Sequence, residues 1–235
     1  MSKRSRKLFA GVAVLLLVLL AIPAQATVLS TYTSRVTWES LVSGRTDIDF
    51  SILGLAQGGY TNYGAAAGLT TGGVNFTGID GAGYDLYAYN PPVGDAQNYG
   101  SGTILRGPQY TAANYLRITL PTGTTAFGID LATIAPAAQS FSVVMDGTGL
   151  GTVQAAAYPN RVFFGVRTDT PITEVRIYLA SGMLYQTQGI FDNVSYGSSS
   201  TAPPAETAEA TTVLYIGSGL GLLFWTRRRQ KLAAL

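Results

Sequence analysis

Tyrosine is concentrated in one glycine-rich stretch of this 235-residue sequence, and its side chain suits carbohydrate recognition. A tyrosine ring offers a flat apolar face that stacks on a sugar ring, while its hydroxyl forms hydrogen bonds. The stretch therefore predicts a ligand face, and packing of the same rings across strands is the alternative interpretation. The residues of this predicted face are Tyr84, Tyr87, Tyr89, Tyr99 and Asn90, with Asp95 as a further polar neighbour.

Two aspartates, Asp49 in the motif DIDF and Asp192 in the motif FDNV, are the candidate metal ligands. They fall in the first and last predicted strands, which often pair in a jelly roll, so their carboxylates could meet. With carbonyls from the glycine-rich loops they could hold a structural Ca²⁺ ion, an arrangement that resembles calcium-bearing carbohydrate-binding sandwiches. Aspartates at strand ends also cap turns, which is the alternative. No other cofactor is expected.

The sequence lacks side chains on which many enzymes depend. It contains no cysteine and no histidine, which excludes thiolate nucleophiles, cysteine-ligated metals and serine triads with a histidine base. A glycosidase needs only two carboxylates, but the only glutamates before the C-terminal linker are Glu39 and Glu174. We therefore expect a protein that is not an enzyme, and a carbohydrate-active hydrolase is the alternative.

Alternation of apolar and polar residues recurs through residues 27–196 and predicts β-strands. In YLRITLP, for example, Leu116, Ile118 and Leu120 fall on one face. Strands this frequent, separated by glycine, proline and Asp-Gly turns, indicate an all-β fold, an antiparallel β-sandwich of jelly-roll type. We expect helix in this domain only as a turn or two near Trp38, and we expect the glycine-rich region 54–109 to form loops along one rim.

The distribution of charge excludes one class of partner. Eight of the 15 basic residues lie in two terminal clusters, so the segment from Thr27 to Thr226 carries seven arginines against all 13 acidic residues, a net charge of about −6. A nucleic-acid-binding surface needs clustered lysine or arginine. We therefore expect no nucleic-acid partner, although the formal charge of the whole chain is +2.

Residues 1–26 have the layout of a secretory signal peptide. Lysines and arginines precede an apolar core from Leu8 to Ile22, and the small-residue site Ala24-Gln25-Ala26 follows Pro23. The core is shorter than the ~20 residues that cross a bilayer, which disfavours the alternative of an uncleaved anchor helix. The sequence thus predicts an N-terminal signal helix, export of the protein and a mature chain that starts at Thr27.

The C-terminal segment, residues 211–235, combines a short apolar helix with a basic end. Its apolar run from Val213 to Trp225 would span about 20 Å as a helix, against a hydrocarbon core of about 30 Å. Arginines follow at once and favour the cytoplasmic side of a membrane. Before this transmembrane-like helix, residues 197–210 are rich in serine, threonine, proline and alanine and predict a flexible stalk.

This C-terminal organisation resembles the PEP-CTERM sorting signal of Gram-negative bacteria that produce exopolysaccharide. Ala208-Glu209-Ala210 stands where that family has Pro-Glu-Pro, so the motif is divergent and only its glutamate is kept. The resemblance implies transit through the inner membrane and cleavage by an exosortase-type peptidase. A permanent single-pass anchor is the alternative. The residues that carry the resemblance are Glu209, Gly217, Gly219, Arg227, Arg228 and Arg229.

Four parts are therefore predicted: a signal peptide (1–26), an extracellular β-sandwich domain (27–196), a flexible stalk (197–210) and a sorting or anchor segment (211–235). We expect an exported structural or adhesive protein of the cell surface or extracellular matrix, with extracellular polysaccharide as its partner. The alternatives are a carbohydrate-active hydrolase and a permanently membrane-anchored β-domain.

Overall fold

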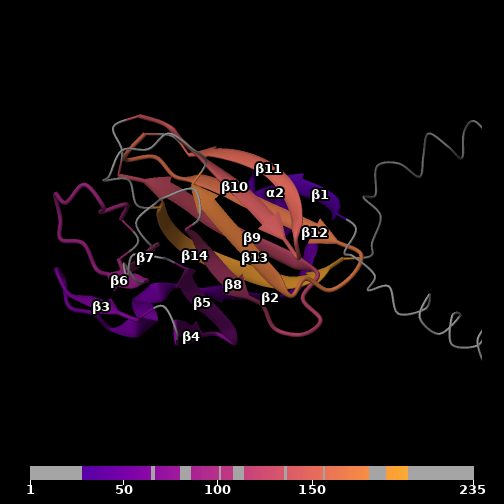
Figure 1. Ribbon diagram of the computed structural model, residues 1–235, viewed down its shortest axis with the longest axis horizontal. Coiled ribbons are helices and arrows are strands. Elements are labelled where there is room, and N and C mark those ends of the chain that lie inside the picture. The colour runs from indigo at the N-terminus through magenta and orange to yellow at the C-terminus, as the bar shows by residue number, and fades with distance from the viewer. Residues whose placement is uncertain are drawn as a thin grey trace, which may run out of the picture. The chain divides into compact units, whose positions relative to one another are not determined.

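Two antiparallel β-sheets and almost no helix make up the described part of the chain in its computed structural model (Figure 1). The structure describes residues 28–64, 67–79, 86–100, 102–107, 114–134, 137–155, 157–179 and 189–200. The predicted signal peptide, the sorting segment with Glu209 and the arginine cluster, and Tyr84 all lie outside these residues. Within the described ranges, no helix has the length and apolar character that crossing a bilayer requires.

The larger sheet, called sheet A, has eight strands in the order β1-β12-β9-β14-β7-β6-β3, and β2 also pairs with β14. Because β14 is 11 residues long, β7 pairs with one part of it and β2 with the other. The strands are β1 (Val28–Tyr32), β2 (Val42–Ile48), β3 (Tyr60–Asn62), β6 (Tyr87–Tyr89), β7 (Ile104–Arg106), β9 (Ala126–Thr133), β12 (Val162–Thr168) and β14 (Gly189–Ser199).

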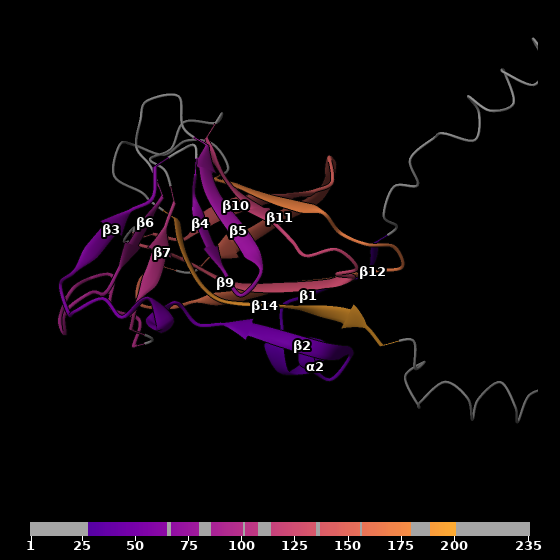
Figure 2. The same ribbon diagram turned by 90° about the horizontal axis from the view of Figure 1, so that it is seen from below.

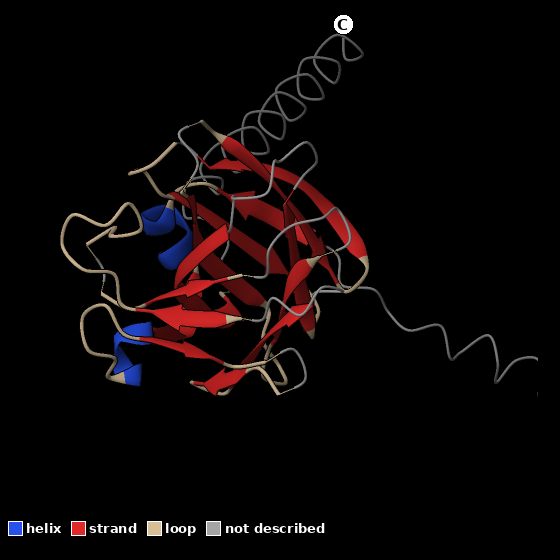
Figure 3. Cartoon of the chain, turned by 60° about the vertical axis from the view of Figure 1, so that its left-hand side comes forward, coloured by secondary structure: helices blue, strands red, loops and turns tan. Residues whose placement is uncertain are grey.

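The smaller sheet, called sheet B, has six strands in the order β11-β10-β13-β8-β5-β4. Figure 2 shows the sheets as two layers, with β4, β5, β10 and β11 in one and β1, β2 and β14 in the other. The strands of sheet B are β4 (Leu69–Thr71), β5 (Val74–Ile79), β8 (Tyr115–Thr119), β10 (Gln139–Met145), β11 (Thr148–Ala155) and β13 (Glu174–Leu179). The described helices are α2 (Arg35–Glu39) and the 3₁₀ helix η1 (Phe50–Leu53), both shown in Figure 3.

The core lies between the sheets and confirms the predicted alternation. Leu116 and Ile118 of β8 are fully buried, and so are the alternate residues of β9, β10 and β13 that face the same space. Phe141 of β10 meets Phe191 of β14 edge-on across this space, at 6.1 Å between ring centres. Each such side chain stabilises the fold by about 1.5–3 kcal/mol through its removal from water.

At β9 and β12, sheet A is buried on its outer side as well, which the one-sided pattern of the sequence does not predict. Trp38 of α2 is fully buried there and donates its indole N–H to the Val166 carbonyl at 3.1 Å. Glycines make room for it: a Cβ added at Gly165 would lie 2.6 Å from Trp38 Cδ1, and one at Gly128 would lie 2.9 Å from the ring of Phe163. The predicted helical turn near Trp38 is thus confirmed, and it covers the strands β9 and β12.

Two boundaries differ from the prediction. The sequence predicts rim loops for the glycine-rich region 54–109, whereas the structure has β3, β4, β5, β6 and β7 there, which extend both sheets. These strands are mostly three residues long, too short for a readable alternation. At the other end, β14 continues to Ser199, whose amide bonds to Thr125 Oγ1, so the first residues of the predicted stalk belong to sheet A.

Candidate functional site

The end of sheet A formed by β3, β6 and β7 brings together tyrosines that the sequence singles out. Tyr87 and Tyr89 stand on one face of β6, because the residue between them is fully buried in the core. Tyr60 of β3 lies directly opposite Tyr89, and Asn62 lies opposite Tyr87. On the other side, Arg106 of β7 lies opposite Tyr87. We call these five residues, Tyr60, Asn62, Tyr87, Tyr89 and Arg106, the tyrosine face.

The tyrosines of this face differ in exposure. Tyr60 lies on the edge strand and is 70% exposed, whereas Tyr87 and Tyr89 are half-buried. Tyr89 donates its hydroxyl to Asp95 Oδ2 at 2.8 Å, and the guanidinium of Arg106 lies 5.8 Å from its ring centre. Burial, together with the hydrogen bond to Asp95, raises the pKa of Tyr89. Tyr60 therefore offers the most accessible ring of the face, and Tyr89 beside it is held by Asp95 and Arg106.

Tyr99 and Asn90, which the sequence assigns to the same ligand face, are committed to the fold. The Tyr99 hydroxyl donates to the Thr133 carbonyl at 2.7 Å, and its ring meets Tyr158 edge-on at 5.5 Å. Burial raises the pKa of Tyr99 to about 12. Asn90 Nδ2 donates to the Leu55 carbonyl at 2.7 Å. Both side chains hold the loop between β6 and β7 to its neighbours.

The sequence does not assign Tyr60 and Asn62 to the ligand face. The sequence contains one indication that they belong together: their spacing in YTN places both on the same side of a strand. A strand of three residues is defined by its pairing with β6, and that pairing cannot be read from alternation.

Asp49, the first candidate calcium ligand, caps a helix. The strands at these two motifs do pair, because β2 and β14 are antiparallel neighbours in sheet A. Asp49 follows β2 directly and is the N-cap of η1, where its Oδ1 accepts the Ser51 amide at 2.9 Å. This is the turn-capping role that the sequence leaves open as the alternative.

Asp192, the second candidate calcium ligand, is neutralised by an arginine. Its side chain is 1% exposed, its Oδ2 lies 2.8 Å from Arg161 Nη1, and its Oδ1 accepts the Asn193 amide at 2.8 Å. A cation would have to displace the guanidinium from a buried carboxylate. Among the residues that the structure describes, no three acidic side chains are placed to hold a metal ion. Asp49 and Asp192 therefore do not fit a shared calcium site.

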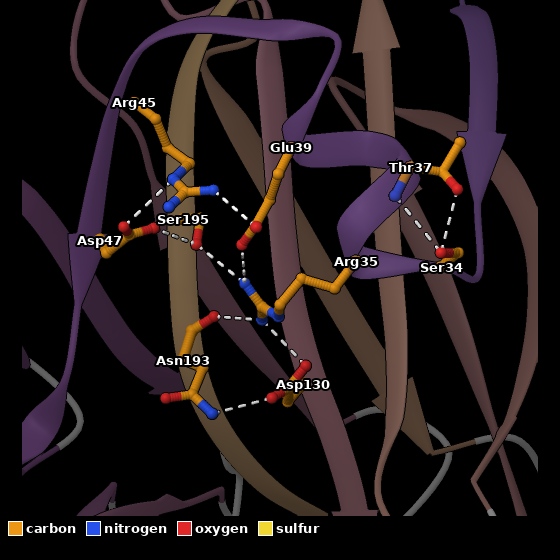
Figure 4. A network of polar contacts seen from close by, with 9 residues as sticks. All are labelled: Ser34, Arg35, Thr37, Glu39, Arg45, Asp47, Asp130, Asn193 and Ser195. Carbon is orange, nitrogen blue, oxygen red and sulfur yellow. Dashed lines mark hydrogen bonds and ion pairs between the residues drawn. The ribbon is translucent and has the colours of Figure 1, made fainter.

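A polar cavity of about 260 Å³ lies on the outer side of sheet A, between α2, β2, β9 and β14 (Figure 4). Four of its eight lining residues are acidic, so we test whether it has the pair of carboxylates that a glycosidase requires. Among the acidic residues that line this cavity, the sequence analysis names only Glu39 as a candidate catalytic carboxylate. The cavity is lined by Arg35, Glu39, Asp47, Ile48, Asp49, Asp130, Asn193 and Ser195.

Arg35 is the centre of the network in this cavity. Its Nη2 donates to Asp130 Oδ1 at 2.8 Å and to the Asn193 carbonyl at 2.6 Å, and its Nη1 donates to Ser195 Oγ at 3.0 Å. The guanidinium lies 4.5 Å from the ring centre of Phe163. Asn193 has φ +46° at an irregularity of β14, a left-handed conformation that asparagine tolerates, and its Nδ2 donates to Asp130 Oδ2 at 2.8 Å.

Of the other three acidic residues of the cavity, Asp49 caps η1, and Asp47 and Glu39 are bridged by Arg45. Arg45 Nε lies 3.1 Å from Asp47 Oδ2 and its Nη1 lies 2.8 Å from Glu39 Oε2. The other oxygen of Asp47 accepts a hydrogen bond from Ser195 Oγ at 2.7 Å. The other oxygen of Glu39 lies 3.8 Å from Arg35 Nη1. A general acid or base must exchange a proton with its substrate, whereas Asp47 and Glu39 each have protein partners on both oxygens. The network is therefore built to tie α2 and β2 to β9 and β14.

The sequence matches no known family model and no curated protein. Among solved structures, similar ones include a family 36 carbohydrate-binding module in complex with calcium and xylotriose, at 14% identity and a TM-score of 0.33 over 58% of this chain and 99% of that one. A family 29 module variant complexed with mannohexaose has 12% identity and a TM-score of 0.36 over 63% and 100%.

The catalytic unit of an α-1,3-glucanase from Streptomyces thermodiastaticus has 15% identity and a TM-score of 0.35, over 63% of this chain and 28% of that one. TM-scores this low do not establish a common fold. The functional argument therefore rests on the side chains of this chain.

Proposed function

We propose that this protein is an exported, non-catalytic β-sandwich that binds extracellular polysaccharide through its tyrosine face. The observation that carries the proposal is the exposure of Tyr60. Its side chain is 70% exposed, although its strand β3 is paired with β6 and places it opposite Tyr89. An exposed ring on a rigid strand, beside amide and phenol groups, can stack on a sugar while its neighbours bond to hydroxyls. Because strand pairing already orders the backbone at these positions, no backbone ordering is required on binding.

The engaged carboxylates of the polar cavity support a binding role rather than hydrolysis. A glycosidase requires one carboxyl group that protonates the leaving group and a second that acts as base or nucleophile. Asp47 and Asp130 accept hydrogen bonds on both of their oxygens. Glu39 forms ion pairs with two arginines, and Asp49 caps η1. We therefore favour polysaccharide binding over hydrolysis as the function of this protein.

The jelly-roll topology expected from the sequence is part of the same proposal. Its support is the order of neighbouring strands, β2-β14-β9-β12 in sheet A and β8-β13-β10-β11 in sheet B. From β8 onward the chain passes from one sheet to the other at every connection except the β10–β11 turn. That alternation between sheets is what a jelly roll requires.

Export and sorting complete the proposed function. The signal peptide at residues 1–26 would direct the chain across the inner membrane, and the PEP-CTERM-like segment would present it to an exosortase-type peptidase before release to the cell surface or matrix. There it would act as a structural or adhesive component. The intact mass of the exported protein tests this step: loss of Arg227 to Lys231 is expected, and a full-length C-terminus would contradict sorting in favour of a permanent anchor.

Binding through the tyrosine face is tested with the Tyr60→Ala variant of the purified full-length chain. We expect the wild-type chain to bind at least one neutral polysaccharide on a glycan array, and Tyr60→Ala to bind it about tenfold more weakly, because it lacks the exposed ring. Ile52→Ala is the matched control, since Ile52 is also highly exposed, at 78%, but lies on η1. Equal binding by Tyr60→Ala and wild type, or no polysaccharide binding at all, would overturn the proposal.

A further inference from the structure

The outer side of sheet B carries an aromatic and basic group of side chains at its centre. β8 and β13 lie side by side (Figure 1). Their register places Tyr115 opposite Tyr178 and Arg117 opposite Arg176. The residues that alternate with these four on the two strands and have described side chains are fully buried in the core. Because strand side chains alternate between faces, the four stand together on the outer side. We call Tyr115, Arg117, Arg176 and Tyr178 the sheet B cluster.

Three members of this cluster hold one another in place. The rings of Tyr115 and Tyr178 lie 4.7 Å apart between centres, with a tilt of 35°. The guanidinium of Arg176 lies 5.4 Å from the ring centre of Tyr115, and its Nε donates to Glu174 at 2.5 Å. Glu174 therefore balances the charge of Arg176, and a cation–π contact adds to the order of the pair.

Arg117 has no such balance. It faces the like charge of Arg176 on β13 and the hydroxyl residue Thr77 on β5. Within the described residues its side chain forms no ion pair or hydrogen bond, and its Nε is buried without an acceptor. Glu174 is the only acidic residue in β5, β8, β10 and β13. Like charges directly opposite in a sheet and a buried donor without an acceptor are both destabilising.

We propose that the sheet B cluster is a second binding site, selective for polysaccharides that carry anionic groups, such as uronate carboxylates or sulfate esters. An anion between Arg117 and Arg176 would accept hydrogen bonds from both guanidinium groups, which suit carboxylate and sulfate oxygens, and would remove the repulsion between them. Tyr115 and Tyr178 would contact the sugar ring that carries the anion. This site goes beyond the tyrosine face and does not depend on it, because it lies on the other sheet.

The rest of the protein is negatively charged, so the binding of a polyanion would depend on the sheet B cluster itself. Residues 27–226 carry a net charge of about −6. A polyanion is therefore repelled by the surface as a whole, and its binding requires a specific site. Loss of one arginine from that site should have a much larger effect than loss of the same charge elsewhere.

The test compares the purified full-length wild-type chain with its Arg117→Gln, Arg117→Lys and Arg45→Gln variants. Arg45→Gln is the charge-matched control, since Arg45 lies on β2 of sheet A. Binding is measured at low and at raised salt to polygalacturonate as the carboxylated probe, dextran sulfate as the sulfated probe and dextran as the neutral probe. Circular dichroism and the urea unfolding midpoint verify that each variant is folded.

We expect wild type and Arg45→Gln to bind an anionic probe equally at low salt, and Arg117→Gln to bind it about tenfold more weakly. Arg117→Lys should fall between them, because lysine keeps the charge but not the planar pair of donors. Binding of polygalacturonate alone would assign the anion as carboxylate, and binding of both charged polymers would assign anions in general. Equal binding by Arg117→Gln and wild type, equal loss in Arg45→Gln, or no binding of either polyanion would each overturn the proposal.

Discussion

The outer sides of the two sheets differ in whether their arginines have acidic partners. On sheet A, Arg35 and Arg161 each lie 2.8 Å from an aspartate, Asp130 and Asp192. On sheet B, Arg117 faces another arginine, and no described residue pairs with it. Arginines of the first kind hold elements of the fold together, whereas one of the second kind is left for a ligand. The same residue type thus has different consequences depending on what the strand register places opposite it.

Register also explains why sheet A needs its arginines. Asp130 of β9 and Asp192 of β14 lie directly opposite one another, which would be repulsive without counter-charges. Arg35 reaches Asp130 from α2, and Arg161 reaches Asp192 from the residue before β12. Two like charges are thus neutralised from two directions, and the covering elements are fastened to the sheet.

The largest effect is expected where sheet A is covered. Trp38→Ala removes a fully buried ring and leaves a cavity above Gly128 and Gly165, so we expect the free energy of unfolding to fall by about 3–5 kcal/mol. Urea unfolding of the variant measures this loss. Val36→Ala on the same helix is the control, because Val36 is 78% exposed and should change stability by about 0.5 kcal/mol or less. A similar small change in Trp38→Ala would mean that α2 does not cover the sheet.

Next in size is the loss of a buried ion pair. Arg161→Gln leaves Asp192, which is 1% exposed, without its counter-charge, and we expect a loss of about 3 kcal/mol in unfolding free energy. Arg45→Gln removes the same charge from the more exposed contacts with Glu39 and Asp47, so a loss of about 1 kcal/mol or less is expected. If the two variants lose stability equally in urea unfolding, burial of the pair is not what distinguishes them.

The strands of the core could be predicted from the sequence, because their apolar residues alternate over five to eight positions. Leu116 and Ile118 show this directly, since both lie where the pattern places them. The cover of sheet A could not be predicted in the same way. It depends on Trp38 meeting Gly128 and Gly165, which lie 90 and 127 residues further along the chain and show no periodicity of their own.

A smaller effect is expected from Tyr99, which holds its loop to β9. Tyr99→Phe removes the hydrogen bond to the Thr133 carbonyl, and we expect a loss of about 1 kcal/mol at neutral pH. The raised pKa of Tyr99, about 12, means that its neutral form is favoured in the folded state. Its contribution is therefore complete below the unfolded value of about 10 and is lost as the pH rises toward 12.

Unfolding midpoints at neutral pH and at about pH 11 measure both parts of this prediction. Tyr99→Phe should lose less stability than wild type between the two conditions, because it has no phenol to ionise at this position. Tyr60→Phe serves as the control, since Tyr60 is 70% exposed. The same alkaline loss in wild type and Tyr99→Phe would show that Tyr99 does not couple ionisation to folding.

The smallest effect has the opposite sign. Arg117→Gln removes one of two arginines that lie directly opposite, so without ligand we expect the free energy of unfolding to stay equal or to rise by about 0.5 kcal/mol. Urea unfolding beside Arg161→Gln makes the comparison between the sheets direct. A loss above about 1 kcal/mol would indicate that Arg117 serves the fold, as the arginines of sheet A do.

Both binding surfaces illustrate what the sequence alone withholds. The sequence places Tyr87 and Tyr89 on one ligand face because they lie close together in the chain, and in the structure they share one face of β6. Tyr60 on the same face, and the alignment of Arg117 with Arg176, depend on which residues the sheet places side by side. The residue type of Tyr99 favours a sugar ligand, whereas in the structure its hydroxyl donates to the Thr133 carbonyl.

The central claim is that the protein recognises polysaccharide through two separate surfaces. The most direct test measures how the Tyr60→Ala and Arg117→Gln variants of the full-length chain bind one neutral and one uronate polysaccharide. Polysaccharide recognition through two separate surfaces predicts that Tyr60→Ala loses the neutral polymer and keeps the acidic one, while Arg117→Gln does the reverse. If both folded variants bind both polymers as wild type does, neither surface recognises polysaccharide and the account is contradicted.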